Sequence, residues 1–490
     1  MKTLIRLLSL LLVLVMLVSC FIACDGGDDE KNTDPSTDPN TNESGEDDSS
    51  LGDMDLGGIT YNILGTDNPN WVHLDNFEIY YDELPEDVVG QAVYNRNQQL
   101  KNKYNFIVSQ TLAASTHETA KISYESGDDL YDLVLYKPVS VQAHAQEGYL
   151  LDLNSIEHIN LEHDSWSQYI NEQLTIADKL YYTTNDFLLL DKARAFYLFY
   201  NRDLASDLNL GYFEDHVDDN TWTLEKMYQL AKQAARDVDN NGPTYTDYFG
   251  LGLQTNFQFI TLAASAGFRV TETNNTGYPT LVGATDKMLN ILDATLELTT
   301  DKSTTWQNIG DIYEQHPETV FLDNRMLFVS AFATFIEYNY KVQESTINFG
   351  ILPNPKYDSD QEEYNSYPDI HHGSVLAIPY TVADESVAGF CLEALTEAST
   401  DTSYVTYIET KCMYQDAPDK DCARMMDLCF ENQAYDIGAF LFSDSGELYA
   451  YVTENMQATG ANLYKRLFDT AKKAAQAELD ELFEDYQKRS

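Results

Sequence analysis

Basic side chains are scarce in this sequence. Its 490 residues include 30 Lys and Arg against 80 Asp and Glu, which gives a formal net charge of −50 at pH 7. A chain this acidic is repelled by nucleic acids and by anionic lipid headgroups. The composition therefore argues against a nucleic-acid partner, while a neutral or cationic ligand remains compatible with the charge.

Motifs of common enzyme classes are also missing. The sequence has no GxSxG nucleophile elbow, no HExxH zinc motif, no phosphate-binding P-loop and no well-placed GxGxxG. Acidic residues are so numerous that any chosen pair of carboxylates is uninformative about glycoside hydrolysis. We therefore expect a protein that is not an enzyme and that requires no cofactor, with a secreted glycan-processing enzyme as the alternative.

Cysteine is rare, with six in the chain, and four of these fall between residues 391 and 429. Cys412 and Cys422 flank a polar loop, so in an exported protein they form a candidate disulfide. Cys391 and Cys429 lie in helical patterns and are expected as buried thiols. No paired cysteines or mixed His and Cys spacing indicates zinc.

The remaining two cysteines lie at the end of an apolar N-terminal run. A basic start precedes this run at residues 4–23, so residues 1–24 are predicted to be a signal peptide. The tetrapeptides ending at Cys20 and Cys24 both resemble the lipobox of bacterial lipoproteins, in which the cysteine is acylated. We favour Cys24, because Ala23 precedes it and the apolar run ends there. Cys20 and a plain membrane-spanning anchor are the alternatives.

Residues 25–58 are predicted to be a disordered acidic linker. They are rich in Asp, Glu, Asn, Ser, Thr, Gly and Pro and carry almost nothing apolar. Such a segment buries too little surface to fold, and its like charges extend it. It would hold a folded body away from a membrane.

The stretch at residues 179–204 organises the rest of the chain. It holds two apolar runs, 187–190 and 195–200, separated by a charged patch at 191–194. Runs this short and this rich in Phe, Tyr and Leu predict buried strands. We interpret the stretch as a crossover between two α/β lobes, with a ligand site between them.

The pattern before the crossover alternates strands with helices, which predicts a doubly wound α/β lobe. The expected strands are 59–64, 106–108 and 133–136, and the expected helices are 89–104 and 116–124. The fold class is therefore α/β with two lobes joined by crossover strands. We divide the chain into a first lobe at 59–190 and 330–385 and a second lobe at 191–329 and 386–490.

Candidate ligand-binding residues follow the predicted strands. In open α/β sheets, ligands bind beyond the carboxyl ends of the strands. Flat aromatic rings and hydrogen-bonding side chains suit a sugar, which has apolar C–H faces and many hydroxyls. The candidates are Trp71, Tyr136, Lys137, Asn185, Asp186, Phe332, Phe335, Tyr338 and His372. For each of them, packing inside the protein is the alternative interpretation.

One segment resembles the first half of a calcium-binding loop. Asp237, Asp239 and Asn241 place oxygens at alternate positions before a glycine. Tyr248 stands where the later bidentate Glu is usual, and Asp247 could substitute for it. The alternative is a turn rich in Asn, Asp and Gly at the exit of a helix.

Taken together, several motifs resemble the extracellular solute-binding proteins of bacterial ABC importers, of the type 1 or maltose-binding-like group. The lipobox and the acidic tether fit this family, and so does the order of the motifs. They are 131–137 (YDLVLYK), 148–154 (GYLLDLN), 179–182 (KLYY), 200–204 (YNRDL), 221–223 (TWT), 237–250 (DVDNNGPTYTDYFG) and 349–356 (FGILPNPK). Residues 92–97 (AVYNRN) and 436–438 (DIG) are similar to one branch of the family.

The resemblance implies a periplasmic-binding-protein-like fold of type II, whose two lobes close over a ligand without chemical turnover. It implies a monomer, lipid-anchored on the outer face of the cell membrane, that passes a small solute to an ABC transporter permease. The expected solute is a sugar or oligosaccharide. A surface adhesion or sensor module is a further alternative, and residues 65–82 depart from the family pattern.

Overall fold

The structure is a computed structural model that describes residues 51–68, 75–253, 257–308, 312–333, 347–412, 420–443 and 447–489. The predicted signal peptide, both candidate lipidation cysteines and most of the linker lie outside these ranges. Within them, no helix combines the length and the apolar character needed to cross a membrane.

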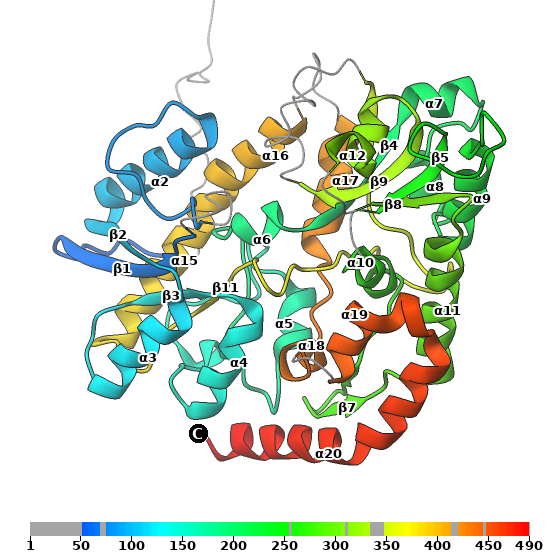
Figure 1. The fold of residues 1–490 in the computed structure, drawn as a ribbon. Coiled ribbons are helices and arrows are strands. Elements are labelled where there is room, and N and C mark those ends of the chain that lie inside the picture. Colours follow the sequence, from blue (N-terminus) through cyan, green and yellow to red (C-terminus); the bar gives the residue numbers. More distant parts are fainter. Residues whose placement is uncertain are drawn as a thin grey trace, which may run out of the picture. The chain divides into compact units, whose positions relative to one another are not determined.

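The first sheet has the strand order β11-β3-β1-β2 (Figure 1). Its first three strands in the sequence run parallel, with Ile59 opposite Phe106, and the last strand is antiparallel to its neighbour. The strands are β1 (Ile59–Thr66), β2 (Phe106–Ala113), β3 (Leu133–Tyr136) and β11 (Val375–Ala377). Every residue of β3 is buried, as expected for a continuous apolar run in a parallel sheet. We call this sheet and its helices the first lobe; these helices are α2 (Val88–Tyr104), α3 (Thr116–Ser126), α4 (Pro138–Glu147) and α15 (Glu385–Ser399).

The second sheet has the strand order β10-β4-β9-β5-β8. Its strands are β4 (Phe196–Asn201), β5 (Phe249–Leu253), β8 (Thr305–Gln307), β9 (Met326–Phe332) and β10 (Phe349–Leu352). All residues of β4, β5 and β10 are buried, so these strands form part of the core. We call this sheet and its helices the second lobe; these helices include α7 (Arg202–Asp207), α9 (Leu224–Ala234), α12 (Pro317–Leu322) and α17 (Lys420–Glu431).

Other elements connect or cover the two sheets. The strands β6 (Thr271–Thr273) and β7 (Pro279–Leu281) form a hairpin. The remaining helices are α5 (Gln168–Leu174), α6 (Leu190–Ala193), α8 (Glu214–Asp218), α10 (Phe257–Ser265), α11 (Asp286–Thr300), α16 (Val405–Cys412), α18 (Ile437–Leu441), α19 (Leu448–Thr459) and α20 (Ala461–Lys488). Short 3-10 turns lie at Leu153–Ser155 and Tyr313–Gln315, and a π-helical turn at Thr400–Tyr404 joins α15 to α16.

Local sequence explains where several helices begin. Asp87 precedes α2 and accepts a hydrogen bond from the backbone N–H of Gly90. Thr223 does the same for α9 by accepting from Lys226. These caps satisfy N–H groups that have no partner inside the helix. The helix α9 then buries one apolar stripe, with Met227 and Ala231 fully enclosed.

The crossover differs in part from the prediction. The run 195–200 forms β4 as expected, but 187–190 is a buried turn that leads into α6. Its backbone is satisfied locally, because Oδ1 of Asn185 accepts from the N–H of Phe187 at 3.1 Å. The ammonium of Lys192 also donates to the carbonyl of Asn185 at 2.9 Å. These bonds occupy the backbone groups that a strand would use for pairing.

The lobe boundaries also differ from those expected. β9 and β10 pair with β4, so residues 330–332 and 349–352 belong to the second lobe. The helix α15 packs on the first lobe instead of the second, and Tyr61 of β1 donates its hydroxyl to the carbonyl of Ala388. Contacts between segments far apart in the sequence decided both points.

The last helix contacts both lobes, and Figure 1 shows α20 running from the second lobe to a position beside α4. Near its start, the ring of Tyr464 packs edge-on against Phe268, with 6.1 Å between the ring centroids. At its end, Gln142 of α4 donates to the hydroxyl of Tyr486 at 3.0 Å. Arg489 then donates to the last carbonyls of α4. The C-terminus of the chain therefore completes the first lobe.

Candidate functional site

The crossover segment before β4 contacts the carboxyl end of a strand of the second sheet. β1, β3 and β9 end at Thr66, Tyr136 and Phe332, and parallel strands present ligand-binding groups at their carboxyl ends. Arg194 lies directly between α6 and β4, and it contacts Phe332 at the end of β9 and Asp369, which precedes β11. Its surroundings therefore form the first candidate site.

Arg194 is held by two contacts from different parts of the chain. Its Nη2 and Nε lie 2.9 and 3.2 Å from Oδ2 of Asp369. Its guanidinium carbon lies 3.5 Å from the ring centroid of Phe332, which also packs against Phe196. A buried cation is tolerated only when it is paired, and here a carboxylate and an aromatic face both stabilise it.

Asp369 in turn binds a histidine that reaches solvent. Nδ1 of His372 lies 3.1 Å from Oδ2 of Asp369, and its side chain is 44% exposed. Burial alone would raise the pKa of Asp369, but the hydrogen bond from His372 and the charge of Arg194 hold it below the usual range. We call Arg194, Phe332, Asp369 and His372 the Arg194 cluster.

Lys137 and His371 lie beside the cluster. The backbone N–H of Val139 donates to the carbonyl of Ile370 at 3.1 Å, which holds the start of α4 against residues 370–372. Lys137 directly precedes α4 and lies close to His371. The sequence prediction thus brought Lys137, Phe332 and His372 into one region.

The loop after β1 is fixed to the same region. Asn76 donates to Oγ of Ser374 at 2.9 Å and to Oε1 of Glu78 at 3.0 Å. Its own Oδ1 accepts from the N–H of Thr66 at the end of β1. Burial raises the pKa of Glu78 to about 7. These bonds order the described part of a loop that the sequence placed near the ligand.

Tyr136 is a core residue instead of a surface one. Its side chain is fully buried, and its hydroxyl lies 2.7 Å from that of Tyr124 and 3.0 Å from Nδ1 of His144. The hydroxyl is thereby committed to an internal network. The last residue of a fully buried strand points into its own lobe here.

Asn185 and Asp186 connect the crossover segment before β4 to α15 and to the π-helical turn that follows it. The amide of Asn185 donates to Oγ1 of Thr396 at 2.7 Å, and Asp186 accepts from Oγ1 of Thr400 at 2.8 Å. Burial raises the pKa of Asp186 to about 6, although the charge of Lys192 acts against this. Both residues therefore hold the junction between the lobes. The other candidates, Trp71, Phe335 and Tyr338, lie outside the described residues.

Sequence reasoning missed the two central charges of the cluster. Arg194 was noted only as part of the charged patch, and Asp369 was not singled out although it precedes the two histidines. The pair is separated by 175 positions in the sequence. A local pattern carries no signal for such a contact.

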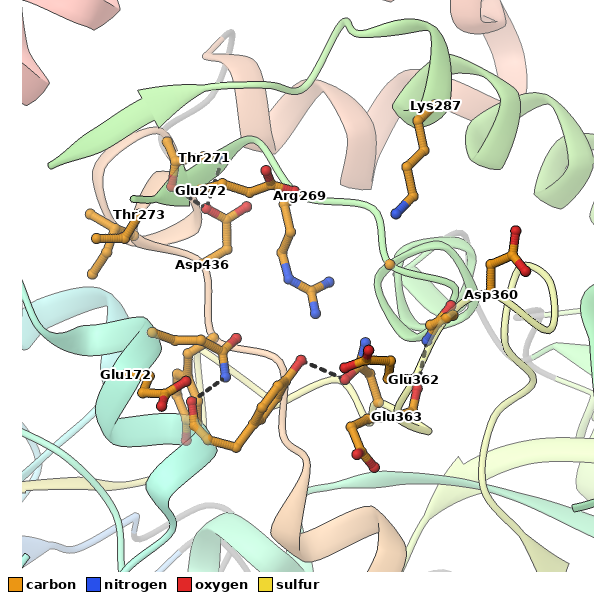
Figure 2. Close-up of a pocket in the computed structure, with 17 residues that line it drawn as sticks. Glu172, Arg269, Thr271, Glu272, Thr273, Lys287, Asp360, Glu362, Glu363 and Asp436 are labelled. Carbon is orange, nitrogen blue, oxygen red and sulfur yellow. Dashed lines mark hydrogen bonds between the residues drawn. The ribbon is translucent and has the colours of Figure 1, made fainter. Parts of the chain in front are cut away.

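A separate cavity of about 480 Å³ lies among the elements that connect and cover the two sheets (Figure 2). Its walls come from α5, from residues 267–273 around β6, from residues 360–365 and from the start of α18. None of the four residues of the Arg194 cluster lines it. It was not anticipated from the sequence.

The predicted calcium loop brings three carboxylates together. Ligand oxygens of Asp237, Asp239 and Asp247 all lie within 4.8 Å of one another. Burial acts to raise the pKa of Asp247, but backbone N–H groups of Val238 and Thr244 hold it below its usual range. Asn241 donates its amide to Asp239 in the same loop. The group presents the hard oxygen donors that calcium prefers.

Three cysteines of the described residues are buried. Cys391 and Cys429 are buried free thiols, as expected, and burial raises the pKa of both. Cys422 is buried on α17, but the side chain of Cys412 lies outside the described residues. The disulfide and the lipidation of Cys24 or Cys20 therefore stay predictions.

Known structures share this fold at low sequence identity. An ABC substrate-binding protein from Listeria monocytogenes, in complex with cycloalternan, is 15% identical over 85% of this chain and 99% of its own, with a TM-score of 0.51. A cyclo/maltodextrin-binding protein complexed with maltotetraose is 13% identical over 89% and 98%, with a TM-score of 0.51. A sugar transporter from Rhizobium etli in an open conformation is 14% identical over 85% and 99%, with a TM-score of 0.55.

These likenesses confirm the two-lobed α/β fold of ABC substrate-binding proteins that the sequence motifs predicted. The structural neighbours are binding proteins rather than enzymes. No family model and no curated protein matches the sequence.

Proposed function

We propose that this chain is an extracellular solute-binding protein that captures a sugar or oligosaccharide for an ABC transporter. The observation that carries the proposal is the Arg194 cluster, which joins the crossover to strand ends of both sheets. Two structures of the same fold contain an oligosaccharide, which supports a carbohydrate ligand. The lack of enzyme motifs supports binding without turnover.

The cluster has donors suited to sugar hydroxyls. Nη1 of Arg194 has no acceptor among the described residues, while its other nitrogens are fixed by Asp369. A guanidinium fixed in this way loses little conformational freedom when it donates to a ligand. His372 and Lys137 add polar groups at the exposed side. Trp71, Phe335 and Tyr338 remain our predicted stacking residues.

Capture then follows from contact with both lobes. A ligand that touches the two lobes together stabilises the closed arrangement over the open one. The proposed pivots are the crossover segment before β4 and the π-helical turn after α15. Two hydrogen bonds link them: Asn185 donates to Thr396, and Asp186 accepts from Thr400. π-helical turns such as Thr400–Tyr404 often occur at functional sites.

We also propose that the mature chain is a monomer acylated at Cys24 and tethered by residues 25–58 to the outer face of the cell membrane. A permease in the same membrane would receive the solute. Mass spectrometry of the N-terminal peptide tests the anchor. Acyl chains on Cys20 would move the site, and a peptide without lipid would contradict the anchor.

A bound calcium ion is a further proposal for the loop at Asp237, Asp239, Asn241 and Asp247. The closeness of the three carboxylates supports it. Each carboxylate oxygen that accepts a backbone N–H keeps a second lone pair for a cation. The ion would stiffen a surface loop of the second lobe and would not take part in ligand capture.

The test of the main proposal separates binding from catalysis. Purified full-length chain is titrated with maltotetraose and with cyclic glucans by calorimetry, and the same mixtures are then analysed for shortened sugars. We expect saturable binding and an unchanged sugar. Release of shorter sugars would favour the glycan-processing enzyme, and no binding to any carbohydrate would contradict the proposed ligand class.

A further inference from the structure

The cavity in Figure 2 contains a buried arginine that faces empty space. Arg269 is 9% exposed, and its Nη1 donates at 2.7 Å to the carbonyls of both Ala264 and Phe268. Figure 2 shows its guanidinium extending from the wall toward the middle of the cavity. Among the described residues, no group accepts from its Nη2 or Nε. The side chain is therefore fixed at one nitrogen and open at the other two.

The nearest carboxylate is already committed elsewhere. Asp436 accepts from the N–H groups of Val270, Thr271 and Gly438, and from the hydroxyl of Thr271. These bonds start α18 and hold it against β6, and Figure 2 shows the contact with Thr271. Among the described residues, Asp436 therefore accepts no hydrogen bond from Arg269, although the two charges interact. The free edge of the guanidinium matches the two oxygens of a carboxylate.

The rest of the lining carries the opposite charge. Five acidic side chains face the cavity, and Lys287 is its only other base within the described residues. None of the five forms an ion pair within the described part of the chain. They are Glu172, Glu272, Asp360, Glu362 and Glu363. A ligand with an excess of positive charge would be attracted to such a lining.

We propose that this cavity binds a cationic amino acid. The α-carboxylate is held by the free edge of Arg269, and the ammonium groups lie among the surrounding carboxylates. A volume of about 480 Å³ lies within the range of small-molecule pockets. This ligand is distinct from the proposed carbohydrate, and it uses none of the residues of the Arg194 cluster.

The test uses L-lysine and cadaverine, which has the same two amines but no carboxylate. Both are titrated into the full-length chain by calorimetry without carbohydrate. We expect saturable binding of one L-lysine. Cadaverine should bind at least about tenfold more weakly, because a charged hydrogen-bonded pair is lost. Arg269→Gln should weaken L-lysine by a similar factor, while Arg325→Gln, at an arginine outside the cavity, should not.

The outcomes are decisive in each direction. Failure of the parent to bind L-lysine, or equal binding of cadaverine, would overturn the proposal. So would an Arg269→Gln variant that folds and binds as tightly as the parent. If this variant does not fold, the double variant Glu362→Gln and Glu363→Gln decides. Unchanged L-lysine affinity in that variant would overturn the role of the acidic lining, and weaker affinity would support it.

Discussion

The indole N–H of Trp166 donates a 3.0 Å hydrogen bond to Oε2 of Glu393, and both residues are buried. The same oxygen accepts from the backbone N–H of Asn160 at 3.2 Å. The other oxygen, Oε1, has no partner among the described residues. Burial raises the pKa of Glu393 to about 7 from its ordinary 4.5, although the two hydrogen bonds act in the opposite direction.

This pKa predicts a pH-dependent stability. Between pH 4.5 and about 7, folded Glu393 keeps a proton that the unfolded chain releases, so its contribution falls as the pH rises. Glu393→Gln keeps a carbonyl acceptor but cannot ionise. We expect the variant to gain roughly 1 to 2 kcal/mol over the parent at pH 8 and little at pH 4.5, measured by urea unfolding.

The matched control is Glu385→Gln, an exposed position in the first turn of the same helix. It should leave the pH dependence of unfolding unchanged. Identical pH profiles for the parent and Glu393→Gln would show that this carboxyl does not titrate in the folded state as its burial indicates.

Replacing Arg194 should weaken carbohydrate binding. Arg194→Gln removes a fixed charged donor, so we expect affinity to fall about tenfold or more. It also leaves the buried Asp369 with His372 as its remaining side-chain partner among the described residues, so melting temperature must be measured beside calorimetry. His372→Ala, at a half-exposed position, tests the same region with less risk to folding. Arg424→Gln, at an exposed ion pair, is the control.

If Arg194→Gln and His372→Ala both fold and bind sugar as the parent does, the ligand lies elsewhere. The Arg194 cluster would then be a structural link between the lobes. A loss of affinity with an unchanged melting temperature would instead support direct contact.

Calcium should stabilise the loop that contains Asp239. A ligand that binds only the folded chain raises its melting temperature, so adding EGTA should lower it and excess calcium should restore it. Asp239→Asn should remove this response, because one carboxylate ligand is lost. Asp358→Asn, in another exposed turn, should retain it. An equal melting temperature with EGTA and with calcium would leave only the turn interpretation.

Gly250 should not tolerate a side chain. A methyl group there would lie 2.2 Å from the carbonyl oxygen of Ala231, so β5 and α9 would have to separate. We expect Gly250→Ala to cost about 3 kcal/mol or more of unfolding free energy in urea. Gly52→Ala is the control, because no atom lies within 4 Å of the added group. Equal stability of the two variants would contradict the tight strand-to-helix contact.

The sequence revealed the strands that are buried on both faces more reliably than their partners. β3 and β4 were located because a short continuous run of aliphatic and aromatic residues is typical of a strand covered on both sides. Residues 187–190 have the same composition but form a turn, since the N–H groups of Phe187 and Leu188 donate to the side chain and the carbonyl of Asn185. Local composition does not distinguish these two ways of burying apolar side chains.

The candidate site was harder to predict because its contacts are remote in sequence. Phe332 and His372 were selected from strand ends, yet they meet only through other residues. Arg194 packs on Phe332 and pairs with Asp369, and Asp369 binds His372. Tyr136 followed the same reasoning and proved to be internal, because a position at a strand end does not determine where the side chain points. Lobe membership failed for a similar reason, since β9 and β10 pair with a strand over 100 residues earlier.

The C-terminal contacts of α20 have a consequence for biosynthesis. The bond between Gln142 and Tyr486 spans 344 positions, and Arg489 donates to the last carbonyls of α4 from a similar distance in the sequence. Contacts this distant in sequence slow folding. The first lobe therefore gains its last contacts only after residues 486–489 have been synthesised, and a chain that lacked them would leave the end of α4 without these hydrogen bonds.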